Sequence, residues 1–416
     1  MSLLLLALLL SPVANAGFDE FSDDFATPNI VIHSEELTLT LKGELEVELH
    51  DIEGKGGPGY DSNTDTLTLG TRSPIVEIDT FWLAYRVGLS DGLAVNSAVE
   101  FTTRGARVGS AWLDWRQDRS ERMEHHVELG YHTPIVALDR RTERYPLAGT
   151  ATWRSPELHA AYELAWRPAR AVRVDLGGSL AMMRPLSLAG VQESTSQTGT
   201  INILTYGEAR SYSGNAPVAG GRGRLTVHGA FAEGFGFVGS LAAQYGTDSL
   251  RSAFPNYREL PGAAAEDPDH RAWWWGGRVG YDAHGAHLLA EGILTREGLI
   301  RRQMAYAQAS YRVRLRDRDR AVHFLEPVLR VERYRLPDGA VVQPSGRALR
   351  STAPINAVSW DWDIVTAALL VGVWRDLVLV RAEADWIDEH NGVPDLDQPD
   401  EPFRNDEWRI QVEVRF

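Results

Sequence analysis

The sequence predicts an all-β fold, namely a transmembrane antiparallel β-barrel of about sixteen strands. Apolar and polar residues alternate in segment after segment, and the connections between these segments are alternately short and long. Beyond residue 16, no apolar run approaches the ~18 residues that a transmembrane helix needs. Because successive side chains of a strand point to opposite faces, a closed barrel would turn one face to lipid and the other to water.

The N-terminal region divides into two parts before the barrel. Residues 1–16 contain an apolar run at 3–10 and end in Ala14-Asn15-Ala16, which predicts a secretory signal peptide cut before Gly17. A short buried helix is the alternative, since no Lys or Arg precedes the apolar run. Residues 17–35 are acidic and lack alternation, so we expect a periplasmic lead that is either disordered or a plug. The barrel is predicted to occupy residues 36–416.

The first strand is the clearest of the set. "LTLTLKGELEVELHD", residues 37–51, alternates almost without a slip for fifteen positions. An ordinary strand has about five or six residues, whereas ~9–11 tilted residues cross the hydrocarbon layer of a bilayer. One face of this strand is apolar and the other is charged, as the wall of a membrane barrel requires.

Fifteen further segments repeat the pattern, and tight turns such as Asp91-Gly92 join several of them into hairpins. The Gly-rich pair at 222–232 and 235–246 is expected to turn at "AEG". The sixteen predicted strands are 36–50, 80–89, 93–103, 106–116, 122–131, 157–167, 171–183, 222–232, 235–246, 272–282, 286–295, 302–315, 322–335, 362–374, 377–387 and 406–416.

The connections predict how the barrel is oriented. Outer-membrane barrels have short periplasmic turns and longer extracellular loops, so both termini are expected in the periplasm. The long inserts are rich in Gly, Pro, Asp, Asn and Ser, which favours solvated loops. One outer connection, near 103–106, is short. The long inserts are 51–74, 132–156, 184–217, 247–270, 337–361 and 388–405.

Composition narrows the class of protein further. The chain has 416 residues, no cysteine and a formal net charge of −15. An exported chain without disulfides must be stabilised by burial or by closure of a sheet. The negative charge argues against a nucleic-acid partner, because phosphates would be repelled. A β-propeller is the rival fold, but no repeat of sequence identity supports it.

Aromatic residues lie near the segment ends, as the interfacial girdles of a membrane barrel would place them. A core position in a soluble β-protein would explain any single one of them. The residues concerned are Phe81, Tyr85, Trp112, Trp115, Tyr131, Trp153, Trp166, Trp273, Trp362, Trp386 and Trp408.

The last segment, "EWRIQVEVRF", alternates strictly and finishes on an aromatic residue. It resembles the terminal strand by which bacterial outer-membrane β-barrels are recognised by their assembly machinery. The resemblance implies the outer membrane of a Gram-negative bacterium. Outer-membrane lipid and lipopolysaccharide would then surround the barrel, and the barrel-assembly machinery would be a partner.

Two late segments carry a second resemblance. "YAQASYRV" (306–313) and "FLEPVLRVERY" (324–334) are similar to late strands of the phosphate-selective porin family. Such porins have sixteen strands, are usually trimeric and let small solutes diffuse, so the resemblance implies a homotrimer. Its phosphate-selective members use a ladder of lumenal arginines and a lysine-rich entrance. This chain departs from that pattern, because its first strand aims glutamates inward and lysine is nearly absent.

The insert at 132–156 is the best candidate for a pore constriction. Arginine is always charged and presents a planar fork of donors, which suits orienting carboxylate, phosphate or sugar hydroxyl groups. A solvated loop with mutual salt bridges is an equally weighted alternative. The candidate residues are Asp139, Arg140, Arg141, Glu143 and Arg144.

Charged residues of the first and last strands are expected to face the lumen. They would form a wall of mixed charge, in which mutual pairing is favoured over a role in selectivity. These residues are Lys42, Glu44, Glu46, Glu48, Arg409, Glu413 and Arg415.

No cofactor and no metal site is predicted. His125 and His126 are adjacent on a strand and point to opposite faces, so they cannot chelate one ion together. "DSNTDT" (61–66) resembles the start of a calcium loop, but Thr66 replaces the required glycine and Arg72 the required glutamate.

Three functions remain open. The favoured one is a porin for passive diffusion of small hydrophilic solutes, which could include anions. The alternative is an outer-membrane channel that exports an acidic polysaccharide, similar to alginate export. An enzyme at the outer rim is disfavoured, because residues such as Ser155 and His159 are not accompanied by a G-x-S-x-G signature.

Overall fold

The computed structural model describes the barrel wall and parts of the long inserts. The described residues are 30–34, 37–52, 59–61, 66–68, 75–90, 92–102, 105–120, 122–132, 141–142, 146–152, 157–183, 186–190, 202–206, 216–241, 250, 254, 257, 260, 270–315, 321–337, 359–374, 377–391 and 406–416.

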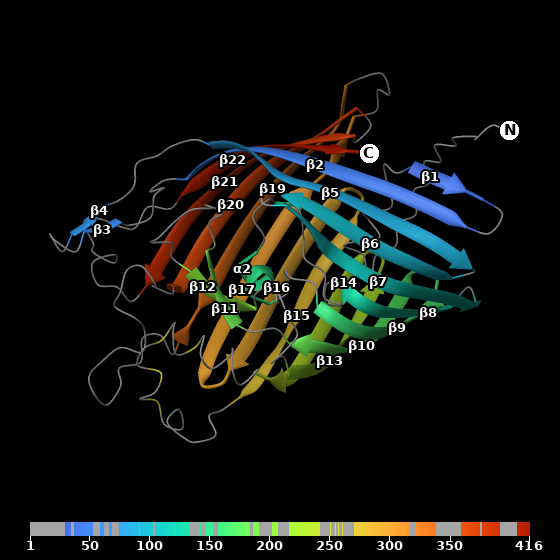
Figure 1. The fold of residues 1–416 in the computed structure, drawn as a ribbon, viewed down its shortest axis with the longest axis horizontal. Coiled ribbons are helices and arrows are strands. Elements are labelled where there is room, and N and C mark those ends of the chain that lie inside the picture. Colours follow the sequence, from blue (N-terminus) through green and yellow to red (C-terminus); the bar gives the residue numbers. More distant parts are fainter. Residues whose placement is uncertain are drawn as a thin grey trace.

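Sixteen antiparallel strands form a closed β-barrel (Figure 1), so the predicted fold class is confirmed. Each strand pairs with its neighbours along the chain, and β2 pairs with β22 to close the ring. The strands of the wall are β2 (Thr38–Ile52), β5 (Ile75–Ser90), β6 (Leu93–Thr102), β7 (Gly105–Ser120), β8 (Met123–His132), β9 (Glu157–Ala169), β10 (Val172–Met183), β13 (Ala216–Val227), β14 (Ala230–Ser240), β15 (Arg271–Ala283), β16 (Ala286–Glu297), β17 (Ile300–Tyr311), β19 (Val322–Arg335), β20 (Ser359–Val373), β21 (Val378–Asn391) and β22 (Glu407–Arg415).

A few short elements accompany the wall. β1 (Ile30–His33) pairs with β2, and β18 (Val313–Arg314) pairs with β19. The inserts contain the hairpin β3–β4 (Gly59–Asp61, Thr66–Thr68), the hairpin β11–β12 (Leu186–Gly190, Asn202–Tyr206) and the helix α2 (Leu147–Thr152). Among the described residues, no helix has the length and apolar character needed to cross a membrane.

The seam between β2 and β22 is closed by Gly43 and Phe416. The Gly43 amide donates to the Phe416 carbonyl at 2.8 Å, and the Phe416 amide donates to the Gly43 carbonyl at 3.0 Å. A Cβ at Gly43 would lie 2.1 Å from the Phe416 ring, so any other residue at this position would force the ring to move. β1 continues the same edge of β2 beyond this point, from the Ile30–Leu41 pair to the His33–Thr38 pair. Residues 30–33 of the predicted lead therefore belong to the sheet.

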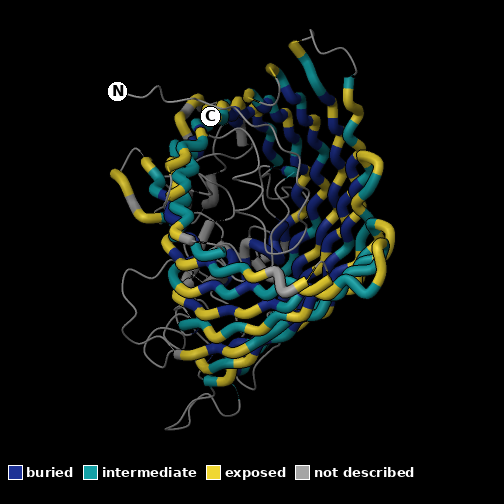
Figure 2. Tube along the Cα trace, turned by 90° about the vertical axis from the view of Figure 1, so that its right-hand side faces the viewer, coloured by how far each residue is buried: buried dark blue, intermediate teal, exposed yellow. Residues whose placement is uncertain are grey.

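Burial alternates along the strands, as Figure 2 shows. The outward face carries exposed apolar side chains such as Leu180 (64 % exposed) and Val238 (64 %). The inward face carries charged residues that are nearly inaccessible, such as Arg330 and Glu297 (both 0 % exposed). This is the reverse of a soluble protein, in which charged residues lie outside and apolar ones inside. The outer surface is therefore suited to a bilayer.

The Gly-rich hairpin turns earlier than the sequence predicts. β13 and β14 join at His228-Gly229, where both residues have positive φ (50° and 85°), as a two-residue hairpin turn requires. The predicted turn at "AEG" instead lies inside β14, and the predicted strand bounds 222–232 and 235–246 are wrong. Glycines along both strands hid the turn, because glycine marks turns and curved strands alike.

The predicted alternation of short and long connections also needs a correction. Short turns join the strand pairs at one end of the barrel, including Arg170-Ala171 and His284-Gly285. At the other end, a second connection is short as well, because Gly298-Leu299 alone separates β16 from β17. The positive φ of Gly298 (59°) allows this tight turn.

The aromatic residues do not all form outward girdles. Trp166 (46 % exposed) and Trp386 (52 %) lie on the outer face as expected. Trp112 (6 %) and Trp362 (1 %) are buried inside, so their assignment to a girdle is wrong. Trp112 is two positions before the buried Asp114 on β7, so both side chains lie on the inner face. The face of the strand, and not the distance to the strand end, therefore determines where the Trp112 ring lies.

Candidate functional site

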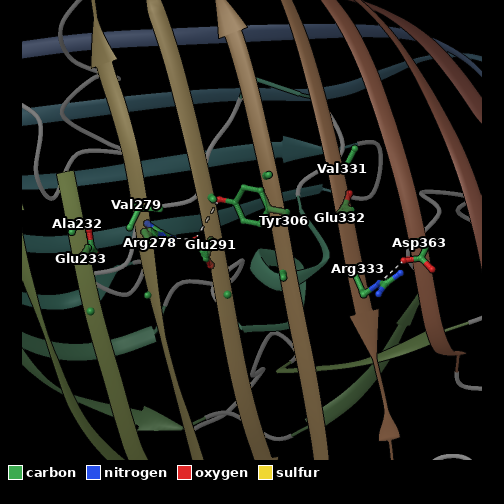
Figure 3. A pocket seen from close by; sticks show the side chains of 16 residues that line it. Ala232, Glu233, Arg278, Val279, Glu291, Tyr306, Val331, Glu332, Arg333 and Asp363 are labelled. Carbon is green, nitrogen blue, oxygen red and sulfur yellow. Dashed lines mark hydrogen bonds and ion pairs between the residues drawn. The ribbon is translucent and has the colours of Figure 1, made fainter. Parts of the chain in front are cut away.

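The inner face of the barrel carries a network of ion pairs between strands that are adjacent or one strand apart. Arg222 of β13 lies 2.5 Å from Glu163 and 3.8 Å from Glu233. Arg278 of β15 donates to Glu291 of β16, as Figure 3 shows. Because a buried charge is stable only when it is paired, this pattern accounts for charged side chains at inward positions.

The charged residues predicted to face the lumen lie on this inner face beside the seam. Arg409 is 2.5 Å from Glu407 and 4.0 Å from Glu48. Arg415 donates to Glu413 and lies 3.6 Å from Glu44. Carboxylate oxygens of Glu44, Glu46 and Glu413 lie within 4.8 Å of one another, and the Lys42 ammonium is 5.2 Å from the Trp82 ring. Sequence alternation was sufficient to find this cluster.

The insert between β8 and β9 enters the barrel and contacts β19. Arg141 Nε lies 3.0 Å from Glu326 Oε1, and Arg330 donates to the Thr142 hydroxyl. Further along, the Leu147 amide donates to Glu332 at 2.7 Å, so α2 lies against the wall. Glu326 is near the short-turn end of β19 and Glu332 near its other end, so Arg141 and Leu147 contact the inner wall at different depths of the lumen. Asp139, Arg140, Glu143 and Arg144 lie outside the described residues.

Arg141 borders a charged cavity of about 440 Å³ near the short-turn end. Three guanidinium groups face two carboxylates there, with two histidines nearby. Arg141 also lies 3.9 Å from Asp282. Apart from Arg141, these residues were missed, although the arginine-rich end of β18 was a usable signal. The lining residues are Arg141, Asp282, His284, Gly285, His287, Arg312, Arg314 and Glu326.

Parts of two other inserts also pack inside the barrel. Leu204 of β12 is fully buried, and its carbonyl accepts a hydrogen bond from Arg302 of β17. Phe254 and Tyr257 are fully buried, and the Leu299 amide lies 3.2 Å from the Tyr257 hydroxyl. The expectation that these inserts are solvated loops is wrong for the described parts.

These buried insert residues form one apolar core with the inner face of the wall. Figure 1 shows α2, β11 and β12 within the outline of the barrel. Among the described residues, this core lies on the side of the lumen bounded by β13 to β21. Its members include Leu147, Ala151, Ile203, Leu204, Phe254, Tyr257, Trp274, Ile293, Met304, Tyr334, Trp362 and Ile387.

Of the two residues considered for an enzyme at the rim, only His159 is described. It lies on the inner face of β9, 4 % exposed, where its nearest charged neighbour is Glu128. Ser155 lies outside the described residues.

A closed antiparallel barrel with a lipid-facing apolar surface and a charged lumen is an outer-membrane β-barrel. No protein-family profile and no curated protein matches the sequence. Solved structures with the same fold are outer-membrane proteins. OmpF of Salmonella typhi, in complex with daunomycin, has a TM-score of 0.54 at 11 % identity, over 93 % of this chain and 100 % of its own.

Two further structures support the same fold. OprB of Pseudomonas putida has a TM-score of 0.53 at 11 % identity, over 92 % of this chain and 94 % of its own. OmpT of Vibrio cholerae, an outer-membrane protein, has a TM-score of 0.51 at 11 % identity, over 93 % and 99 %. At this identity the likeness establishes the porin-type barrel fold. A link to the phosphate-selective family stays a prediction.

Proposed function

We propose that this protein is an outer-membrane porin that lets small hydrophilic solutes diffuse passively through its lumen. The observation that supports the proposal is that Arg141, Thr142 and Leu147 of the insert at 132–156 contact the charged inner wall at β19. A barrel of sixteen strands is wide enough to hold water, so an infolded insert and lumenal charges would set which solutes pass.

Small anions are the solutes that the cavity at Arg141 favours. Three arginines and two carboxylates give its lining an excess of positive charge. Arginine stays charged at any physiological pH, so the excess would persist. Asp139, Arg140, Glu143 and Arg144 would extend the same constriction.

The test is the reversal potential of purified protein in a planar bilayer under a salt gradient. Changing Arg141 to Ala should shift the ion preference toward cations, and changing Arg140, Arg141 and Arg144 together should shift it further. Arg333→Ala is the matched control, because Arg333 is 66 % exposed on the outer face and pairs with Asp363 there. An ion preference that stays fixed in the triple variant would place the insert outside the conducting path.

Export of an acidic polysaccharide is the alternative function. The same planar-bilayer recordings distinguish it from passive diffusion. A porin conducts small ions steadily, whereas an exporter should be strongly blocked by its uronate polymer. The described lumenal arginines lie against carboxylates, and the apolar core occupies one side of the lumen. Neither feature favours a polyanion path. Turnover of lipid or peptide by purified protein would instead support an enzyme.

We also propose a homotrimer. The outer wall over β14 to β19 has a hollow of about 920 Å³, edged by the Arg333–Asp363 ion pair (Figure 3). Small side chains let neighbouring backbones approach closely in a membrane. Native mass spectrometry should give a trimer, and Ala305→Trp should weaken it while Ala160→Trp on β9 does not. The small residues that line the hollow are Ala232, Gly234, Gly277, Ala290, Gly292, Ala305 and Ala307.

The remaining proposed partners follow from the surface and from β22. Phe416 is 43 % exposed on the outer face of the seam, where the assembly machinery could reach it. Lipid and lipopolysaccharide would cover the apolar outer wall. Removing Phe416 should lower the amount of barrel assembled in the outer membrane.

A further inference from the structure

Three side chains converge on the inner wall where β8 meets the insert. Glu128 and His132 belong to β8, and His159 belongs to β9. Glu128 Oε2 lies 3.2 Å from His132 Nδ1 and 3.5 Å from His159 Nε2. One ligand atom from each residue lies within 4.8 Å of the other two.

The wall is shaped to bring these groups together. Gly130 stands directly opposite His159 in the β8–β9 register, so no side chain separates Glu128 from His132 on that face. The Trp112 ring stacks on His132 with centroids 4.0 Å apart and 6° between the planes. The imidazole of His132 is therefore held in place by packing.

The surroundings of His159 on β9 indicate that this residue binds a ligand. His159 is 4 % exposed, and among the described residues its Nδ1 has no hydrogen-bond partner, while its Nε2 lies 3.5 Å from Glu128 Oε2, at the limit of a hydrogen bond. A buried imidazole nitrogen whose hydrogen bond is weak or missing destabilises the folded chain, and a bound metal ion would offset this loss.

The distances match a first-row divalent metal. Bonds of about 2.0–2.2 Å in a tetrahedral site place neighbouring ligand atoms ~3.3 Å apart. Two histidines and one carboxylate suit Zn²⁺ and leave a fourth position open. We propose that Glu128, His132 and His159 form a zinc site on the lumenal wall, with the open position facing the lumen.

Neighbouring residues are arranged to support the carboxylate. His126 Nε2 lies 2.7 Å from Asp114 Oδ1 and 3.5 Å from Glu128 Oε1. The second carboxylate oxygen of Glu128 is thus occupied by His126, while Oε2 faces the two ligand histidines. Such orienting groups commonly accompany metal ligands.

The site departs from the sequence-based expectation of no metal. That expectation rested on the adjacent pair His125 and His126, which do point to opposite faces. Two of the ligands proposed here are four positions apart on β8 and the third is on β9, and this spacing matches no known metal-binding motif. Because His132 is the last residue of β8, a bound ion would fix the point at which the insert leaves the wall.

The experiment is a zinc titration of the purified full chain in detergent, after chelator treatment, followed by calorimetry. One zinc ion per chain is expected. Loss of a group that merely orients a ligand costs about 10–100-fold in metal affinity, so His132→Ala and His159→Ala should each weaken binding by at least ~10-fold. His125→Ala is the matched control, because this outward histidine lies 2.8 Å from the Tyr162 hydroxyl.

A spectroscopic measurement on the unmodified protein tests the same proposal without relying on variants, which could fold poorly. X-ray absorption at the zinc edge of the unmodified protein should show the multiple scattering of two imidazole rings within a shell of nitrogen and oxygen ligands. Zinc held by carboxylates alone, as at Glu44, Glu46 and Glu413, would overturn the proposal. So would equal affinities in the ligand variants and the control. Neither measurement depends on whether solutes pass through the barrel.

Discussion

At the residue scale, the face on which a side chain lies was the most predictable property. The alternation that places Lys42 and Glu48 inside and Leu180 outside is a direct result of strand geometry. Trp112 is an exception, because it was assigned to an outer girdle from its place near the end of a strand. Its place in the alternation of β7 would have put it on the inner face. Contacts such as those of His159 could not be predicted, because they depend on which residues of another strand lie opposite.

Gly43 provides a test of the seam at this scale. We expect Gly43→Ala to displace the Phe416 ring and destabilise the barrel by about 1–2 kcal/mol, as overpacking usually does. The measurement is denaturant unfolding in detergent. Gly88→Ala is the control, because the nearest atoms to its Cβ would be at 3.7 Å.

A double variant separates this contact from a general intolerance of change at Gly43. In a Phe416→Ala background, Gly43→Ala should have little further effect, since the two residues would no longer compete for space. Additive losses would contradict the direct contact.

At the scale of elements, the sixteen strands were all anticipated, whereas the interior of the barrel was not. Alternation along one strand is local information and needs no knowledge of the rest of the chain. The inserts gave a misleading signal, because glycine, proline and polar residues surround the few apolar side chains that pack inward, such as Leu204 and Phe254. The Gly-rich β13–β14 hairpin was misplaced for a similar reason.

Arg302 links two of these elements. It is 0 % exposed, donates to Glu297 on β16 and to the Leu204 carbonyl of β12. Arg302→Met should destabilise the protein by about 3–5 kcal/mol, because the buried Glu297 carboxylate would lose the guanidinium that neutralises its charge.

Adding Glu297→Gln should recover much of that loss. Thermal unfolding followed by circular dichroism compares the two variants. If the double variant is as unstable as Arg302→Met, then the loss comes from the released β11–β12 hairpin rather than from the unpaired carboxylate.

At the scale of the whole molecule, the lumen is asymmetric. The wall from β13 to β21 supports an apolar core with the inserts, whereas the wall around β2 and β22 carries charged groups. Solutes would therefore follow the charged side. The position of the core could not be predicted from sequence, since it depends on which inserts fold inward.

This asymmetry predicts the effect of loosening the core on conduction. Phe254→Ala together with Tyr257→Ala should raise single-channel conductance and its noise, because the insert at 247–270 would lose its buried anchors. Leu329→Ala is the control, since this residue is 53 % exposed on the outer wall. Unchanged conductance in the double variant would show that the core lies away from the conducting path.

The seam has a consequence for how the protein is made. Glu44 is paired with Arg415, and their separation along the sequence is 415 − 44 = 371 positions. Contacts between such distant partners form slowly, because a very long loop of chain must be brought together first. Until β22 has emerged, residues 44–52 of β2 have no partner on that edge, because β1 pairs only with residues 38–41, so this part of the edge must be shielded from aggregation.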